Sequence, residues 1–190
     1  MPDDNIHTIA AIVVMGVSGS GKSTIGQALA QRLGFASEDG DIYHPAANVN
    51  KMRSGIALSD EDRWPWLRTL AGLIDRYAKL NRPVVIACSA LKRTYRDVLL
   101  HGREDVRIVC LKGSPDVIAG RTDRRTGHFM PPSLLASQLE ELEEPAPDEH
   151  AITVDIDAPA DTIVSAIVRQ LHLPASAGMP RTPSSSRPRM

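Results

Sequence analysis

The order of apolar segments along the chain predicts an α/β fold in three layers, with helices on both faces of a parallel sheet. Short apolar runs rich in β-branched residues, typical of strands buried on both faces, alternate with longer segments of helical periodicity. A strand, a helix and a second strand in succession form a right-handed crossover, which makes neighbouring strands parallel. The length of 190 residues suits one domain with a substantial core.

Five strands are expected from the apolar runs. The first run is continuously apolar and stops at Gly16, where the pattern changes abruptly. The later runs are equally short, and each is bounded by polar or turn-forming residues. The predicted strands cover residues 10–15, 35–38, 84–88, 108–111 and 152–155.

Helices are expected between these strands. Ile25, Leu29 and Leu33 recur every four residues and therefore share one helix face, which Gly34 can end. Ser59 stands before three acidic residues, a pattern typical of a capped helix start, and this helix should reach about residue 80. Residues 39–59 between these two elements should be irregular or form short helices. Further helices are expected over residues 92–100, 115–125, 135–142 and 163–171.

A phosphate-binding motif follows the first strand. Residues 16–23 match the P-loop pattern G-x-x-x-x-G-K-[ST] without a mismatch, and the motif lies between a buried strand and a helix, as it requires. Its backbone N–H groups and the helix N-terminus favour a bound anion, so ATP is the expected cofactor. Lys22 should reach the β- and γ-phosphates, and Ser23 should help to hold Mg²⁺. The predicted nucleotide-binding residues are Gly16, Val17, Ser18, Gly19, Ser20, Gly21, Lys22 and Ser23.

Two carboxylates follow the second predicted strand. Asp39 and Asp41 should lie at the carboxyl edge of the sheet, where ligands bind in doubly wound folds. One carboxylate can hold metal and the other can accept a proton from an attacking hydroxyl. We predict Asp39 as the metal residue with Ser23, and Asp41 as the catalytic base. The alternative is that both aspartates cap a turn or a helix.

Composition limits the class of partner. A net charge of −1 gives no electrostatic basis for binding nucleic acid or an anionic membrane surface, so a small molecule is expected instead. Cys88 and Cys110 lack the spacing of a zinc site and are interpreted as buried thiols in a reducing cytoplasm. The early apolar stretch is too short to span a bilayer. A cytoplasmic protein is therefore predicted.

Several motifs together resemble the gluconate kinases, a family of P-loop small-metabolite kinases related to shikimate kinase. The P-loop alone is shared by many enzymes, whereas the combination with the other segments is specific. The resemblance runs from about residue 9 to residue 171. The segments that carry it include Asp39-Gly40-Asp41 with His44-Pro45, Pro65-Trp66-Leu67, Cys88-Ser89-Ala90-Leu91-Lys92 and Gly127-His128-Phe129.

The resemblance implies a P-loop nucleoside triphosphate hydrolase-like fold and ATP-dependent phosphorylation of D-gluconate to 6-phospho-D-gluconate, with a homodimer as the family expectation. Gluconate is a polyol ending in a carboxylate, so its pocket needs hydrogen-bonding groups and a fixed cation, preferably an arginine. The candidates for acceptor binding, besides Asp41, are His44, Arg53, Ser89, Lys92 and Arg96.

A mobile basic lid is predicted after the fourth strand. Arg121, Arg124 and Arg125 end a predicted helix just before Gly127, and a basic segment closing over the triphosphate would exclude water and stabilise charge. We predict that Arg124 is catalytic, and that Arg121 and Arg125 bind the nucleotide. The alternative is a solvated helix end, where basic residues favour the helix dipole.

Two other functions remain open from the sequence. The chain could be a kinase of the same fold that acts on another acceptor, such as shikimate, or an ATP-binding regulatory module without turnover. Residues 1–173 are predicted to form the kinase domain. Residues 174–190, almost entirely Pro, Ser, Ala, Gly and Arg, are predicted to be a disordered tail because they cannot bury enough apolar area to offset their ordering entropy.

Overall fold

The computed structural model describes residues 9–123 and 132–172. Within them, five strands form one sheet in the order β2-β3-β1-β4-β5, and every neighbouring pair is parallel. The predicted strands are confirmed, with ends that differ from the prediction by at most two residues. Their bounds are β1 Ala11–Met15, β2 Ala36–Asp39, β3 Val84–Ala87, β4 Val106–Lys112 and β5 Ile152–Asp155.

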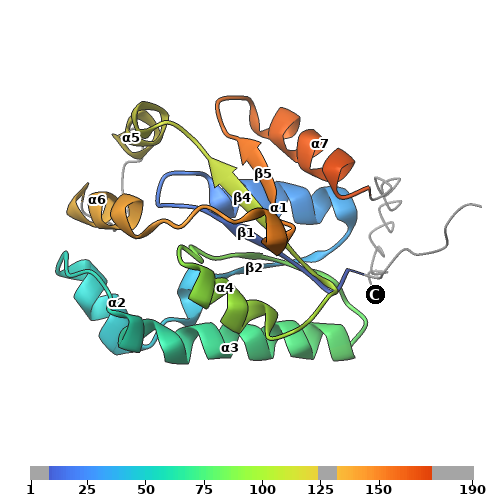
Figure 1. Cartoon of the computed structure of the whole chain (residues 1–190), viewed down its shortest axis with the longest axis horizontal. Coiled ribbons are helices and arrows are strands. Elements are labelled where there is room, and N and C mark those ends of the chain that lie inside the picture. The colour runs from blue at the N-terminus through green and yellow to red at the C-terminus, as the bar shows by residue number, and fades with distance from the viewer. Residues whose placement is uncertain (1–8, 124–131, 173–190) are drawn as a thin grey trace, which may run out of the picture.

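Helices cover both faces of the sheet, so the predicted three-layer architecture is confirmed. Helices α1 and α7 lie on one face and α3 and α4 on the other, while α2, α5 and α6 lie at one end of the sheet (Figure 1). The α-helices are α1 Lys22–Leu33, α2 Ala46–Arg53, α3 Asp60–Lys79, α4 Arg93–Leu100, α5 Pro115–Asp123, α6 Pro132–Glu141 and α7 Ala160–Gln170, and the 3₁₀ turns are η1 Gly40–Tyr43 and η2 Pro147–Glu149.

Alternate side chains of β1 pack into two separate hydrophobic cores, one on each face of the sheet. Ile12 and Val14 pack with the apolar stripes of α1 and α7, whereas Val13 and Met15 pack with α3 and α4. All four side chains are fully buried. Each large apolar side chain buried in this way contributes about 1.5–3 kcal/mol, so β1 holds the start of the P-loop firmly against both cores.

Helix α3 begins where its sequence predicts. The Ser59 side chain accepts a hydrogen bond from the backbone N–H of Asp62, and the Asp62 carboxylate accepts one from the N–H of Ser59, which completes a capping box. Lys51 of α2 donates to the same carboxylate at 2.7 Å. The start of α3 is therefore fixed to α2, and this connection forms one wall of the site described below.

The predicted short helices of residues 39–59 are η1 and α2. Gly40 begins η1 so close to β3 that a Cβ atom there would lie 2.6 Å from the carbonyl oxygen of Ala87. The order of the strands also places β1 between β3 and β4, and the backbone N–H of Gly16 donates to the carbonyl of Ser89 at 3.3 Å. The segments that follow β1, β2 and β3 therefore meet at one edge of the sheet.

The cysteines fit their predicted structural role. Burial raises the pKa of Cys88 to about 12 and that of Cys110 to about 11, so both thiols stay protonated at neutral pH. No helix within residues 9–123 and 132–172 combines the length and apolarity that crossing a bilayer requires. The predicted tail, residues 174–190, lies outside the described residues.

Candidate active site

The P-loop turns tightly at its glycines. Gly16 has φ of 147°, and a Cβ there would lie 2.7 Å from the Ser20 hydroxyl and 3.0 Å from the carbonyl oxygen of Leu111. Gly21, with φ of 93°, is the residue that precedes α1. Only glycine adopts both conformations without strain. The loop therefore leads directly into the positive end of the α1 dipole, which is the arrangement that binds a phosphate.

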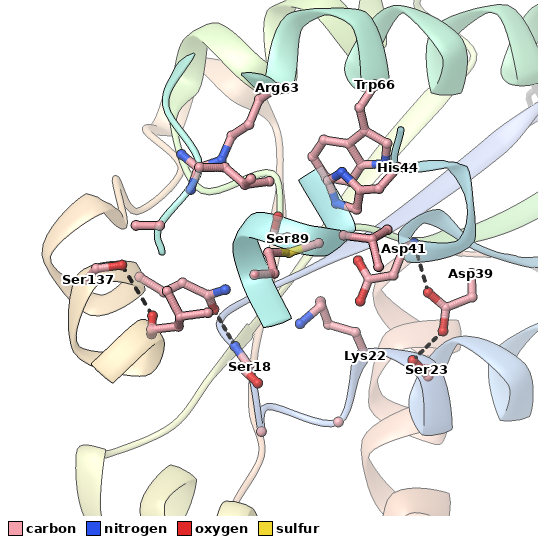
Figure 2. A pocket seen from close by; sticks show the side chains of 18 residues that line it. Ser18, Lys22, Ser23, Asp39, Asp41, His44, Arg63, Trp66, Ser89 and Ser137 are labelled. Atoms are coloured by element: carbon pink, nitrogen blue, oxygen red, sulfur yellow. Dashed lines mark hydrogen bonds between the residues drawn. The ribbon is translucent and has the colours of Figure 1, made fainter. Parts of the chain in front are cut away.

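Lys22 is held against the loop that precedes it. Its Nζ atom donates to the carbonyl oxygen of Val17 at 3.0 Å, so the ammonium group lies across the P-loop. Figure 2 shows Lys22 and Asp41 pointing into the same part of the pocket. The lysine charge is thus available on the side where the predicted base lies.

Ser23 and Asp39, the residues predicted to hold magnesium, are in contact. The Ser23 hydroxyl donates to Asp39 Oδ2 at 2.8 Å, and Asp39 Oδ1 accepts from the backbone N–H of Asp41 at 3.1 Å. In the described part of the chain, no group of three or more His, Cys, Asp or Glu side chains is placed to hold a metal ion. A hydroxyl and one carboxylate nevertheless suit Mg²⁺, which usually takes its remaining ligands from water and nucleotide phosphates.

A pocket of about 430 Å³ opens between the P-loop, η1, α2, α3 and α6. Ser18, Lys22, Asp39 and Asp41 line it, as does Ser89, which follows β3. Figure 2 shows these side chains arranged around one cavity. Ser89, the two aspartates and the phosphate-binding loop are therefore brought together, although they lie at the ends of three different strands.

His44 lines the same pocket and is held in place by stacking. Its ring lies on the Trp66 ring with centroids 4.0 Å apart and planes 19° apart, and Trp66 Nε1 donates to the Gly40 carbonyl at 2.8 Å. Burial, together with the nearby charge of Arg63, lowers the pKa of His44 to about 4. The imidazole is therefore neutral at pH 7, and it offers the pocket hydrogen bonding rather than charge.

Arg63 is the pocket cation that the sequence interpretation missed. It is only 7 % exposed, yet it lines the pocket from the first turns of α3. Its Nη1 atom donates to the Tyr95 hydroxyl at 2.8 Å and forms an ion pair with Glu141 Oε2 at 2.8 Å. Helical spacing could have revealed that Arg63 points inward, because it falls on the same face of α3 as Trp66, Leu67 and Leu70, which face the core.

Two of the predicted acceptor cations lie elsewhere. Arg53 is exposed at the end of α2, and neither Arg53 nor Lys92 is among the residues that line the pocket. Lys92 Nζ donates to Asp60 Oδ1 at 2.7 Å. This hydrogen bond lowers the pKa of Asp60 and raises that of Lys92, which shows that the two charges stabilise each other.

The position of Arg96 requires a correction. Its side chain is 1 % exposed and does not line the pocket. The guanidinium group forms an ion pair with Glu149, with Nη2 to Oε1 at 2.9 Å, and Nη1 contacts the carbonyls of Ala90, Leu91 and Glu143. The geometry therefore assigns Arg96 to the joining of α4 to η2, because a buried charge needs these fixed partners.

Helix α6 supplies a pocket wall that the sequence did not reveal. Leu134, Ser137 and Gln138 line the cavity, and Gln138 Oε1 accepts a hydrogen bond from the backbone N–H of Ser18 at 2.6 Å. Most of the predicted lid lies outside the described residues. Arg121 belongs to α5, while Arg124, Arg125 and Gly127 fall outside the described residues.

Comparisons with known proteins find relatives that match most of the chain. The model of a family described as an AAA domain matches residues 12–145. A probable gluconokinase of Mus musculus is 46 % identical over 177 residues, which cover 84 % of this chain and 96 % of the relative. The thermoresistant gluconokinase of Escherichia coli (strain K12) is 43 % identical over 85 % of this chain and 93 % of its own.

A solved structure shows the same likeness in three dimensions. The crystal structure of a gluconokinase from Sinorhizobium meliloti 1021 superposes with a TM-score of 0.78 and 46 % sequence identity, over 87 % of this chain and 93 % of that one. The identical residues are spread over most of the chain and are not confined to the P-loop. The chain belongs to the gluconokinase family of P-loop kinases.

Proposed function

We propose that this protein transfers the γ-phosphoryl group of ATP to the terminal hydroxyl of D-gluconate, which gives 6-phospho-D-gluconate and ADP. Family membership supports the reaction class. The observation that carries the proposal is one cavity in which a P-loop, two aspartates and a buried arginine meet. These parts answer the three needs of the reaction: a phosphate cradle, a proton acceptor and a cation for the acceptor carboxylate.

On the nucleotide side, the P-loop amides and the N-terminus of α1 bind the phosphates, and Lys22 stabilises charge that develops on the transferring group. Ser23 and Asp39 fit a magnesium ion, which when bound neutralises phosphate charge. The contact between Lys22 and Val17 keeps the ammonium group over the loop before the nucleotide arrives. Lys22 therefore already lies beside the phosphate-binding loop.

On the acceptor side, Asp41 accepts the proton of the attacking hydroxyl, and neutral His44 and Ser89 hydrogen-bond the polyol. Arg63 holds the acceptor carboxylate, since a guanidinium group matches a carboxylate with two parallel hydrogen bonds. We prefer Arg63 to Arg53 for this role because Arg63 lines the pocket.

Three further predictions from the sequence stay part of this proposal: the role of the lid arginines, the domain boundary and the oligomeric state. Arg121, Arg124 and Arg125 act on the triphosphate, and residues 1–173 form the kinase domain with 174–190 as its tail. A cytoplasmic homodimer is the proposed state of the protein. Size-exclusion chromatography with light scattering tests the dimer, and a chain truncated after Leu173 with parental turnover and melting temperature would support the domain boundary.

The acceptor is tested by a coupled ADP-release assay. We expect kcat/KM for D-gluconate to exceed that for the neutral hexitol D-glucitol by at least about 100-fold, because D-glucitol lacks the carboxylate that Arg63 is proposed to bind. Shikimate has a carboxylate but carries its hydroxyls on a rigid ring, so we expect it to be a poor acceptor as well. Equal turnover of shikimate would favour the other acceptor that the sequence left open. ATP binding without turnover of any acceptor would favour the regulatory module.

Replacing Arg63 with alanine is expected to lower kcat/KM for gluconate by roughly 10- to 100-fold, the equivalent of one charged hydrogen bond, and to change KM for ATP little. The loss should be much smaller with D-glucitol, which has no carboxylate for Arg63 to bind. Arg63→Lys should recover part of the loss, because lysine keeps the charge but not the forked geometry.

The matched comparison is Arg53→Ala. It removes the same charge from the exposed end of α2, and a change within a few-fold is expected with either acceptor. A selective loss with gluconate in Arg53→Ala but not in Arg63→Ala would place the carboxylate at α2 and contradict our assignment. Melting temperatures of both variants separate loss of binding from loss of fold.

A further inference from the structure

One face of helix α6 borders the pocket. Leu134, Gln138 and Glu141 are spaced by four and three residues, so they lie on the same side of the helix. Leu134 and Gln138 line the cavity directly, and Glu141 pairs with Arg63, which also lines it. Two elements that bind anions in the proposed reaction, the P-loop and Arg63, are therefore each in contact with α6.

The contact of Gln138 uses a backbone group of the P-loop. Gln138 Oε1 lies 2.6 Å from the Ser18 nitrogen, within the eight residues whose N–H groups cradle phosphate. A carboxamide oxygen and a phosphoryl oxygen are both acceptors, and one N–H cannot satisfy both fully. Gln138 therefore occupies a hydrogen-bond position that a triphosphate can use.

Glu141 likewise occupies a position that a substrate group can use, in this case the acceptor carboxylate beside Arg63. Its carboxylate lies 2.8 Å from Arg63 Nη1, and its side chain is 24 % exposed whereas that of Arg63 is 8 % exposed. An incoming acceptor carboxylate would meet both the arginine charge and the repulsion of Glu141. Displacement of Glu141 would free Arg63 Nη1 for the acceptor carboxylate.

We propose that Gln138 and Glu141 are further specificity-determining residues, which act as internal substitutes for the substrate anions. Gln138 takes the place of a phosphoryl oxygen on the P-loop, and Glu141 takes that of the acceptor carboxylate on Arg63. The second part rests on the proposed function. Because both residues belong to one helix, displacement of α6 by either substrate favours binding of the other.

The chain beyond α6 permits such a displacement. The N–H of Glu143 donates to the Leu91 carbonyl at 2.9 Å, and the Glu143 carboxylate accepts from the N–H of Arg93 at 2.7 Å. These contacts attach the end of α6 to the start of α4 without using the pocket. Loss of the two pocket contacts therefore leaves α6 connected to the fold, and ATP and gluconate should bind with positive coupling.

The nucleotide arm of the test needs no acceptor. Gln138→Ala is expected to bind AMP-PNP, a non-hydrolysable ATP analogue, about two- to tenfold more tightly than the parent by isothermal titration calorimetry, because one competing hydrogen bond is removed. Equal or weaker binding would show that Gln138 supports the loop rather than competing for it, and would overturn its role as a substitute.

The acceptor arm uses Glu141→Gln, which keeps a neutral hydrogen-bond acceptor beside Arg63. We expect KM for gluconate to fall about two- to tenfold, while KM for D-glucitol stays unchanged. Glu140→Gln, an exposed carboxylate on the same helix, is the matched control and should change neither value. A higher KM for gluconate in Glu141→Gln would make Glu141 a ligand of the substrate and contradict the proposal.

The coupling itself is measured as the ratio of AMP-PNP dissociation constants without and with gluconate. A ratio of about five or more is expected for the parent, falling toward one in the Gln138→Ala/Glu141→Gln double variant. A parental ratio of one, or an unchanged ratio in the double variant, would overturn the inference. Absence of gluconate turnover in the parent would instead refute the proposed function, and the nucleotide arm would still test Gln138.

Discussion

Replacement of Lys22 by alanine is expected to leave a folded protein whose kcat is lower by at least about 100- to 1,000-fold, the loss typical of one preorganised donor at a developing charge. The Lys22 ammonium group donates a hydrogen bond to the Val17 carbonyl in the P-loop. Its loss removes little from the core. The measurement is the coupled ADP-release assay, with a thermal melt of the same sample.

Lys79→Ala is the matched control for Lys22. Lys79 is exposed in the last turn of α3, at the opposite end of that helix from Arg63. The same charge is removed there, and turnover should stay within a few-fold of the parent. Activity of Lys22→Ala within a few-fold of the parent would contradict the assignment of the P-loop lysine to phosphoryl transfer.

The second large effect concerns Asp41. Asp41→Asn keeps the size of the side chain but cannot accept the proton of the attacking hydroxyl, so kcat with gluconate should fall by roughly two to four orders of magnitude, the usual range for general-base catalysis. AMP-PNP binding should be largely preserved, because the carboxylate of Asp41 is proposed to act on the acceptor. Steady-state kinetics and calorimetry measure the two quantities separately.

Asp39→Asn should behave differently from Asp41→Asn. Asp39 accepts from the Ser23 hydroxyl through one oxygen and from the Asp41 backbone through the other, so an amide at this position loses an acceptor on one side. The Mg²⁺ concentration needed for half-maximal activity should therefore rise. Equal and small losses of activity in Asp39→Asn and Asp41→Asn would indicate that both aspartates have a structural role, the alternative that the sequence left open.

The cations of the pocket show where sequence reasoning reaches its limit. The sequence offers Arg53, Lys92 and Arg96 as cations for the acceptor carboxylate, but none of them lines the pocket. Arg96 is paired with Glu149, 53 residues further along the chain. Arg63 meets Glu141 at a still larger separation. The position of a long charged side chain depends on such remote partners, which local spacing cannot reveal.

Local patterns in the sequence determined the strands, the helices, the P-loop and the capped start of α3, because each depends on neighbouring residues alone. Only the tertiary structure decided which charges enter the pocket and that α6 forms its wall. Parallel strands bring together segments that are far apart in the chain, and the burial of a charge is stable only where those segments supply its partner. The place of Arg63 and α6 in the pocket wall therefore follows from packing between distant segments of the chain.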